Sequence, residues 1–145
     1  LCRAQDVLLD ECFENSVCLS ADVSNAFDPN WPETCDKRNN SQLNYGVAIC
    51  KYTGSRGKGG ASDASAEAMG HVRSTLDKAG VIWQIATLGK VDQGGGGTVA
   101  AYMANRNIVT VDAGVPVLSM HAPLELVSKL DCYETMLACK AIYLA

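Results

Sequence analysis

The chain has 145 residues, which is enough for one domain with a buried core. Its formal net charge is −4 and its 12 Lys and Arg residues are scattered, so no nucleic-acid partner is expected. No apolar run approaches the roughly 20 residues that a membrane-spanning helix needs, so no membrane partner is expected either.

The cysteine pattern favours reduced thiols. The seven cysteines are an odd number and form no C-x-x-C pair, which argues against a disulfide framework and against a zinc ribbon. Cys132 and Cys139 are seven residues apart and are expected to be small core residues on one helix face. We therefore expect a cytoplasmic protein. Leu1 is not an initiator Met, and no apolar signal segment follows it, so the chain is expected to begin inside a longer protein.

In the first half of the chain, two strands are expected on either side of a long loop. Residues 1–13 predict a weak helix, and the small and β-branched residues 16–23 predict a strand buried on both faces. Polar residues and prolines predict a loop over 28–45. Residues 46–52 then predict a second short strand.

The second half alternates helices with strands. A helix over 63–79 is expected, with Ser62 or Asp63 as its cap and Gly80 at its end. Its apolar stripe consists of Ala68, Met69, Val72, Leu76 and Ala79. The elements expected after it are a strand over 81–88, a short helix over 98–105, strands over 108–112 and 115–120, and a helix from about Pro123 with Leu126, Leu130, Leu137 and Ala141 on one face.

This alternation predicts an α/β fold, a three-layer sandwich with a mainly parallel central sheet. The helix over 63–79 and the C-terminal helix are expected to pack on that sheet. No linker or internal repeat divides the chain, so residues 1–145 are expected to lie in a single domain.

Two glycine-rich segments need interpretation. Residues 54–60 are expected to be mobile, and they do not form a phosphate-binding loop because Tyr52 stands where the first glycine should be. Residues 94–97, just before Thr98, could either bind an anion or form a flexible turn. The sequence has no G-x-S-x-G motif and no Cys with a His placed by motif, so nucleophilic catalysis has no support.

Asp22 and His121 are the candidate metal ligands. Each stands at the end of an apolar strand, and ligand sites of α/β sheets form beyond the carboxyl ends of strands. A carboxylate and an imidazole at one edge would make two ligands of a zinc site, which needs at least three protein ligands. The alternatives are an Asp that caps a turn and a His that is only hydrogen-bonded. His71 is expected to be an exposed helix residue.

Four segments in order resemble the aspartyl aminopeptidase or aminopeptidase I family of dinuclear zinc metallo-aminopeptidases. They are Ser20–Asn30, Gly59–Glu67, Gly89–Thr98 and Asp112–Glu125, and the resemblance extends from about Ser16 to the end. It implies that the chain is the C-terminal part of a catalytic domain that removes N-terminal residues from peptides.

The resemblance also implies a set of site residues. Asp22 and His121 would be terminal ligands, one for each of two zinc ions, with Mn or Co possible in place of zinc. Ligand geometry then places their side chains within about 8 Å of each other. No catalytic residue can be assigned in this chain, because the general base is expected upstream of Leu1 together with an earlier His, a bridging Asp and a Glu-Glu pair.

For the substrate, the resemblance implicates five residues. Gly95, Gly96 and Thr98 lie in the segment similar to the glycine-rich substrate loop. Asp28 stands where acid-selective members have His, which argues against a strong preference for N-terminal Asp or Glu. Lys51 matches a lysine that meets the substrate carboxylate in those members, which argues the other way, and its alternative is a solvated strand-end lysine.

The expected partners are peptide substrates and further copies of the chain, since the family assembles into homo-oligomeric dodecamers when full-length. Two alternatives stay open. The chain could be a catalytically inactive fragment, or it could belong to a related dinuclear-metal aminopeptidase or endoglucanase-like family.

Overall fold

A computed structural model describes residues 2–56, 59–60 and 62–145. The segment 54–60, predicted to be mobile, lies partly outside these residues. The elements are the 3-10 helices η1 (Cys2–Gln5) and η2 (Pro32–Thr34), the helices α1 (Leu9–Glu14), α2 (Ala66–Ala79), α3 (Ala100–Ala104) and α4 (Lys129–Tyr143), and the strands β1 (Val17–Ser20), β2 (Ser24–Asn25), β3 (Val47–Cys50), β4 (Trp83–Ala86), β5 (Val109–Gly114), β6 (Pro116–Leu118) and β7 (Leu126–Val127).

The larger sheet has four strands in the order β1-β5-β3-β4. β1 pairs in parallel with β5 and β3 in parallel with β4, whereas β3 and β5 are antiparallel. The prediction of a mainly parallel sheet is therefore confirmed. A smaller sheet, β2-β6-β7, stands beside it, and its two-residue strands β2 and β7 were not predicted.

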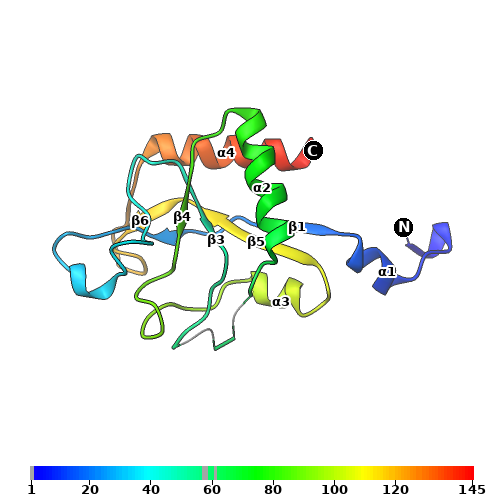
Figure 1. Cartoon of the computed structure of the whole chain (residues 1–145), viewed down its shortest axis with the longest axis horizontal. Coiled ribbons are helices and arrows are strands. Elements are labelled where there is room, and N and C mark those ends of the chain that lie inside the picture. Colours follow the sequence, from blue (N-terminus) through cyan, green and yellow to red (C-terminus); the bar gives the residue numbers. More distant parts are fainter. Residues whose placement is uncertain (1, 57–58, 61) are drawn as a thin grey trace.

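Helices lie on both sides of the larger sheet (Figure 1). The core forms on one side, where Val47, Ile49 and Val111 are fully buried in a cluster with residues of α2 and α4. The short helix α3 lies on the other side, and Thr98 just before it contacts Asp112 of β5. The α/β layering predicted from the alternation of strands and helices is present.

Helix α2 begins and ends at clear signals. Its cap is Ser65, whose side chain accepts a hydrogen bond from the Ala68 N–H, rather than the predicted Ser62 or Asp63. It ends at Gly80, which has the left-handed φ of 69°. The predicted stripe is buried except at Ala79, the last helical residue, which is exposed.

The C-terminal helix starts later than predicted. Leu126 is in β7, which pairs with β6, and α4 begins only after Ser128, whose side chain caps it. Of the predicted apolar face, Leu126 and Leu130 are exposed and Leu137 and Ala141 are partly buried against the core, where the apolar residue of α4 that is fully buried is Ala138. Cys132 is exposed and Cys139 is half-buried, so the prediction that Cys132 is a core residue is wrong.

A buried carboxylate joins α4 to the start of β3. Asp131 is fully buried, and its two oxygens accept the N–H groups of Asn44 and Gly46 at 2.8 Å each. Gly46 is required at this turn because it has a φ of 83° and a Cβ there would lie 2.1 Å from the Ile82 carbonyl oxygen. These contacts fix where β3 enters the sheet.

The N-terminal segment projects away from the sheets (Figure 1). The helix predicted over 1–13 is, within the described residues, a 3-10 turn followed by the six-residue α1, and neither has a buried residue. In the part of the chain that the structure describes, no helix combines the length and the apolar character needed to cross a bilayer.

Candidate functional site

An open cleft of about 300 Å³ lies beyond the end of β1, between the two sheets and the glycine-rich loop 94–97. Predicted site residues from both halves of the chain line it, namely Asp22, Gly95, Gly96, Thr98 and His121. The other residues on its wall are Val23, Asn25, Leu88, Gly89, Gly97 and Met120. The structure thus brings five predicted residues together and leaves Asp28 and Lys51 outside the cleft.

Asp22 is held by close backbone packing against β5. A Cβ at Gly114 would lie 1.1 Å from the Asp22 carbonyl oxygen, so only glycine permits this approach. Two residues further on, the Ser24 N–H donates to the Val115 carbonyl at 2.9 Å. The carboxylate itself is exposed, and its Oδ1 accepts the Val23 N–H at 2.7 Å. This local bond to the next residue is compatible with the hydrogen-bonded alternative to metal binding, and no hydrogen bond of Oδ2 is described.

His121 reaches the cleft from the smaller sheet. Its strand, β6, pairs in parallel with β2, which begins two residues after Asp22, and this pairing brings the two side chains to one cleft. The expectation that both lie at the edge of a single sheet is therefore wrong. The short turn after β6 gives His121 a φ of 69°, and its N–H donates to Glu125 Oε1 at 2.5 Å. The imidazole is exposed.

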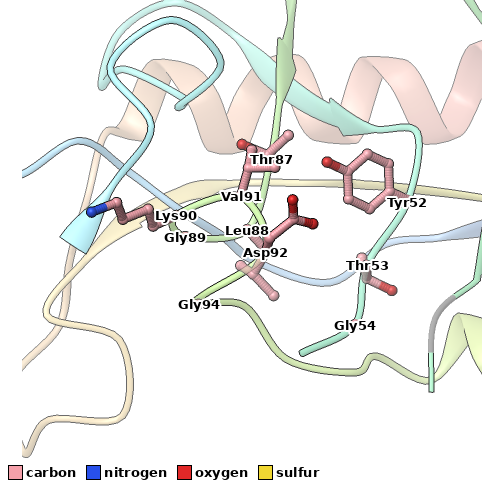
Figure 2. A pocket seen from close by; sticks show the side chains of 10 residues that line it. All are labelled: Tyr52, Thr53, Gly54, Thr87, Leu88, Gly89, Lys90, Val91, Asp92 and Gly94. Atoms are coloured by element: carbon pink, nitrogen blue, oxygen red, sulfur yellow. The ribbon is translucent and has the colours of Figure 1, made fainter. Parts of the chain in front are cut away.

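Glycine is required in the loop that forms the opposite wall of the cleft. Gly95 has a φ of 90°, and a Cβ there would lie 2.4 Å from the Gly54 oxygen and 2.7 Å from the Leu88 oxygen. The Gly54 N–H donates to the Gly96 carbonyl at 2.7 Å. Figure 2 shows the Tyr52–Gly54 segment opposite the Thr87–Gly94 segment around a small adjoining cavity of about 20 Å³. These loop-to-loop contacts favour a braced turn over a flexible one.

Asp112 is a residue of this region that sequence reasoning did not single out. It lies on β5 beside Ser20 of β1, is 5% exposed, and lines a small cavity that also reaches Asp22 and Thr98. Its Oδ1 accepts the Thr98 hydroxyl at 2.8 Å and its Oδ2 accepts the Ser62 hydroxyl at 3.0 Å. The available signal was a carboxylate inside an otherwise apolar strand, which is rarely buried without partners.

Lys51 and Asp28 have partners of their own outside the cleft. The Lys51 ammonium forms an ion pair with Asp63 and donates to the Ala64 carbonyl at 3.1 Å. Asp28 Oδ1 accepts the Asn30 N–H at 2.8 Å in a turn of the long loop. The substrate roles of both residues stay predictions.

No cysteine is among the residues described on the cleft wall, and two thiols of the larger sheet have raised pKa values. The pKa of Cys50 is raised to about 11, chiefly because the thiol is buried; the Ser24 hydroxyl, 3.6 Å from its sulfur, partly offsets this rise, and the negative charge of Asp112 adds to it. Burial and, to a lesser extent, Asp112 also raise the pKa of Cys18. All seven cysteines are free. Neutral thiols are weak nucleophiles, so the cleft does not offer cysteine chemistry.

The donors on the cleft wall are of the kinds that zinc takes. Carboxylate and imidazole are both zinc ligands, but a catalytic zinc uses three protein ligands and one open position. Among residues 2–56, 59–60 and 62–145, no group of three or more His, Cys, Asp or Glu side chains is arranged to hold a metal ion. The described residues of the cleft thus offer two donors of the kinds that zinc takes, which is fewer than the three that a catalytic zinc uses.

Residues 3–143 match the family described as aminopeptidase I zinc metalloprotease (M18). The chain is 52% identical over 136 residues to a probable M18 family aminopeptidase 1 of Clostridium acetobutylicum, covering 93% of this chain and 29% of that protein. It is 47% identical over 140 residues to a probable M18 family aminopeptidase 1 of Thermotoga maritima, covering 97% of this chain and 31% of that protein. The chain therefore belongs to the aminopeptidase I zinc metalloprotease family.

Solved structures agree with this assignment. The M18 aminopeptidase of Thermotoga maritima superposes with a TM-score of 0.91 at 46% identity, over 97% of this chain and 32% of that one. Aminopeptidase I of Clostridium acetobutylicum gives a TM-score of 0.88 at 49% identity, over 95% and 30%. The yeast mApe1 dodecamer, at 22% identity and a TM-score of 0.75 over 94% and 28%, shares the fold. The chain spans just under a third of the length of the curated relatives described above.

Proposed function

We propose that this chain is the C-terminal part of the catalytic domain of a zinc aminopeptidase that removes N-terminal residues from peptides. Asp22 and His121 are metal ligands in this proposal, one for each ion of a dinuclear site. The observation that carries the proposal is the cleft, whose wall includes Asp22, His121 and residues of the glycine-rich loop. The family to which the chain belongs is described as zinc metalloproteases. The family resemblance supplies the residue roles.

The residues of the chain have separable tasks in this proposal. When bound, a pair of zinc ions supplies Lewis acidity for the peptide carbonyl and lowers the pKa of water. The Val23 N–H holds one oxygen of Asp22, which orients the carboxylate. Gly95 and Gly96 carry no side chains and leave room for a peptide backbone along the opposite wall. The group that accepts the proton of the attacking water would come from outside the chain.

The proposed substrates are peptides without a strong requirement for an acidic N-terminal residue. Lys51 could attract a substrate carboxylate, but its ammonium already lies against Asp63 and the Ala64 carbonyl. Asp28, which would repel such a carboxylate, is occupied in a turn. Comparing turnover of aspartyl, glutamyl, leucyl and alanyl substrates tests this directly. A preference above about a hundredfold for Asp or Glu, worth some 3 kcal/mol, would show that Lys51 is used for selection.

The assembly and location belong to the same proposal. The solved mApe1 relative is a dodecamer, which supports a homo-oligomeric, dodecameric assembly for the longer protein that contains this chain. We also propose a cytoplasmic location and zinc as the metal, with manganese or cobalt as possible replacements.

The test is turnover in two forms of the protein. The longer protein should release a chromogenic leaving group from aminoacyl substrates in the presence of zinc, manganese or cobalt, and Asp22→Ala or His121→Ala in it should abolish turnover. The 145-residue chain alone should show none, because it offers two metal ligands and no base. Robust turnover by the chain alone would show that the site is misplaced, and a longer protein without any turnover would favour the alternative of a catalytically inactive product.

A further inference from the structure

We infer that Asp112 is a positioning residue for this cleft: its buried carboxylate fixes the glycine-rich loop that forms the substrate wall. The inference rests on the proposed function, since it assigns a task within the same site. Asp112 does not line the 300 Å³ cleft itself. It acts through Thr98, which does.

Asp112 is rigidly placed at the centre of the sheet. It is paired with Ser20 of β1 on one side and with Cys50 of β3 on the other. Its neighbours Val111 and Ala113 alternate into the helix-covered core, so the carboxylate points to the opposite side of the sheet. Asp112 is only 5% exposed, so its side chain is held by the surrounding protein atoms and has little contact with solvent.

From this position the carboxylate holds two loops together. Thr98, at the end of the glycine-rich loop, donates its hydroxyl to Oδ1 at 2.8 Å, and Ser62, from the loop before α2, donates to Oδ2 at 3.0 Å. The two loops also touch directly, because the Gly54 N–H donates to the Gly96 carbonyl at 2.7 Å and the Arg56 N–H donates to the Gly94 carbonyl at 3.3 Å. The carboxylate of Asp112 thus links the glycine-rich loop on the cleft wall to the loop before α2.

The direction of the hydrogen bonds requires a group that only accepts. A hydroxyl has one proton, and those of Thr98 and Ser62 are both given to Asp112. Thr98 can then accept the Ala100 N–H at 3.2 Å, and Ser62 can accept from Thr53, whose hydroxyl is 3.2 Å away. An amide at position 112 would present a donor to one of the two hydroxyls and leave that hydroxyl's proton without its acceptor. Charge-assisted bonds of this kind are about twice as strong as neutral ones.

The consequence for function concerns substrate binding more than metal binding. The loop that Asp112 holds carries Gly95 and Gly96 on the cleft wall, whereas Asp22 is fixed independently by Gly114 and by the Ser24 bond to Val115. Loss of the carboxylate should therefore loosen the wall and leave the proposed metal ligands in place. A residue that only stabilised the fold would not separate these two properties.

The experiment uses the longer protein with Asp112→Asn, Thr98→Val and the double variant. Asp112→Asn should raise KM about tenfold or more while bound zinc stays at the wild-type level. The double variant should be no worse than the poorer single variant, because both remove one connection. The matched control is Asp77→Asn, which makes the same chemical change where Asp77 accepts the Trp83 Nε1–H at 2.8 Å, away from the cleft, and should leave KM unchanged.

Hydrogen exchange supplies a readout that does not depend on activity. Amides of residues 94–98 should exchange faster in Asp112→Asn than in Asp77→Asn, and this result would support the inference even if the wild-type protein showed no turnover and the proposed function failed. An active wild type with unchanged KM and unchanged exchange in Asp112→Asn would overturn the inference. Loss of zinc in a folded Asp112→Asn would also overturn it, since Asp112 would then act on the metal. If Asp112→Asn does not fold, Thr98→Val is measured in its place and should show the raised KM and the faster amide exchange of residues 94–98. A wild-type KM together with wild-type exchange rates in Thr98→Val would overturn the inference.

Discussion

The two faces of the larger sheet differ sharply, although the same strands build both. Toward α2 and α4, β3 presents Val47 and Ile49, which are fully buried in the apolar core. Toward the cleft, the same strand presents Ala48 and Cys50, which form only a small cluster with Ala86. Successive side chains of a strand point to opposite faces of the sheet. The same strand therefore contributes side chains both to the apolar core and to the face that borders the cleft.

The small residues of the cleft face allow loops to approach the sheet closely. Glycine at 114 admits the backbone of Asp22, and the short side chains of Ser20 and Ser24 leave room around Asp112. The face of the larger sheet toward α2 and α4, here called the helix face, stabilises the fold because it buries apolar area. The opposite face, here called the cleft face, buries less apolar area and carries polar groups instead. Substitutions on the two faces should therefore change different properties.

The largest expected loss of stability comes from the helix face. Ile49→Ala should lower the free energy of unfolding by about 2–5 kcal/mol, because Ile49 is fully buried and leaves a cavity among α2 and α4. Urea unfolding measures this. The neighbouring Cys50→Ala, on the cleft face, removes less volume and should cost clearly less. Equal losses for the two variants would contradict the division between the faces.

Gly114→Ala should damage the cleft most. Its Cβ would meet the Asp22 carbonyl oxygen, so the segment after β1 must move, at a cost of about 1–3 kcal/mol in stability. A shift of the proposed ligand by about 1 Å should lower turnover of the longer protein roughly a hundredfold.

The control for this substitution is another glycine. Gly70→Ala, within α2, has no neighbouring atom within 4 Å of the new Cβ and should stabilise the chain by about 0.5–1 kcal/mol. Undiminished turnover in Gly114→Ala would show that the close approach does not set the position of Asp22.

Stability should depend on pH through Cys50. Its pKa is raised by burial from 9.0 to about 11, so in the folded chain the thiol stays neutral where the unfolded chain ionises. The stability that Cys50 contributes is complete below pH 9 and is lost as pH rises toward 11, by about 2 kcal/mol at pH 10.5.

The comparison of wild type with Cys50→Ala isolates this contribution from other groups that titrate in the same range. The difference between their unfolding free energies should shrink between pH 8 and about pH 10.5. A difference that stays constant with pH would mean that the Cys50 thiol is not protected from ionisation.

The smallest effect is expected at Ser20. Its hydroxyl is buried, and among the described residues it has no hydrogen-bond partner. Ser20→Ala should therefore leave the free energy of unfolding unchanged within about 1 kcal/mol, or raise it slightly. Ser62→Ala removes a hydroxyl that Asp112 binds and should destabilise the chain measurably. A large loss in Ser20→Ala would reveal a polar contact on the cleft face that this account omits.

The main elements could be predicted because their signals are local. The alternation of apolar strands with helices and the apolar stripe of α2 predicted the layers, and Gly80 marked the end of α2, whereas the cap of this helix is Ser65 and not the predicted Ser62 or Asp63. The two-residue strands β2 and β7 have no periodicity to detect, and pairing of β7 with β6 delayed the start of α4. Such pairings are set by tertiary contacts that no short window contains.

The site was predicted unevenly. Asp22 and His121 were singled out by their positions at strand ends and the loop 94–97 by its glycines, the family resemblance added their roles, and the structure gathers them in one cleft. Asp112 was missed because its importance comes from two hydroxyl partners 14 and 50 positions away in the chain. Lys51 and Asp28 were implicated by matching positions alone, and their local partners could not be inferred from them.

The central claim is that His121 and Asp22 hold metal, and the metal content of the longer protein tests it most directly. Zinc bound per chain should be about two in the wild type and should fall to one or less in His121→Ala, because that ion loses its only ligand from this segment. His71→Ala, which alters the exposed histidine of α2, is the matched control and should keep the wild-type value. Full zinc content with unchanged turnover in His121→Ala would contradict the account.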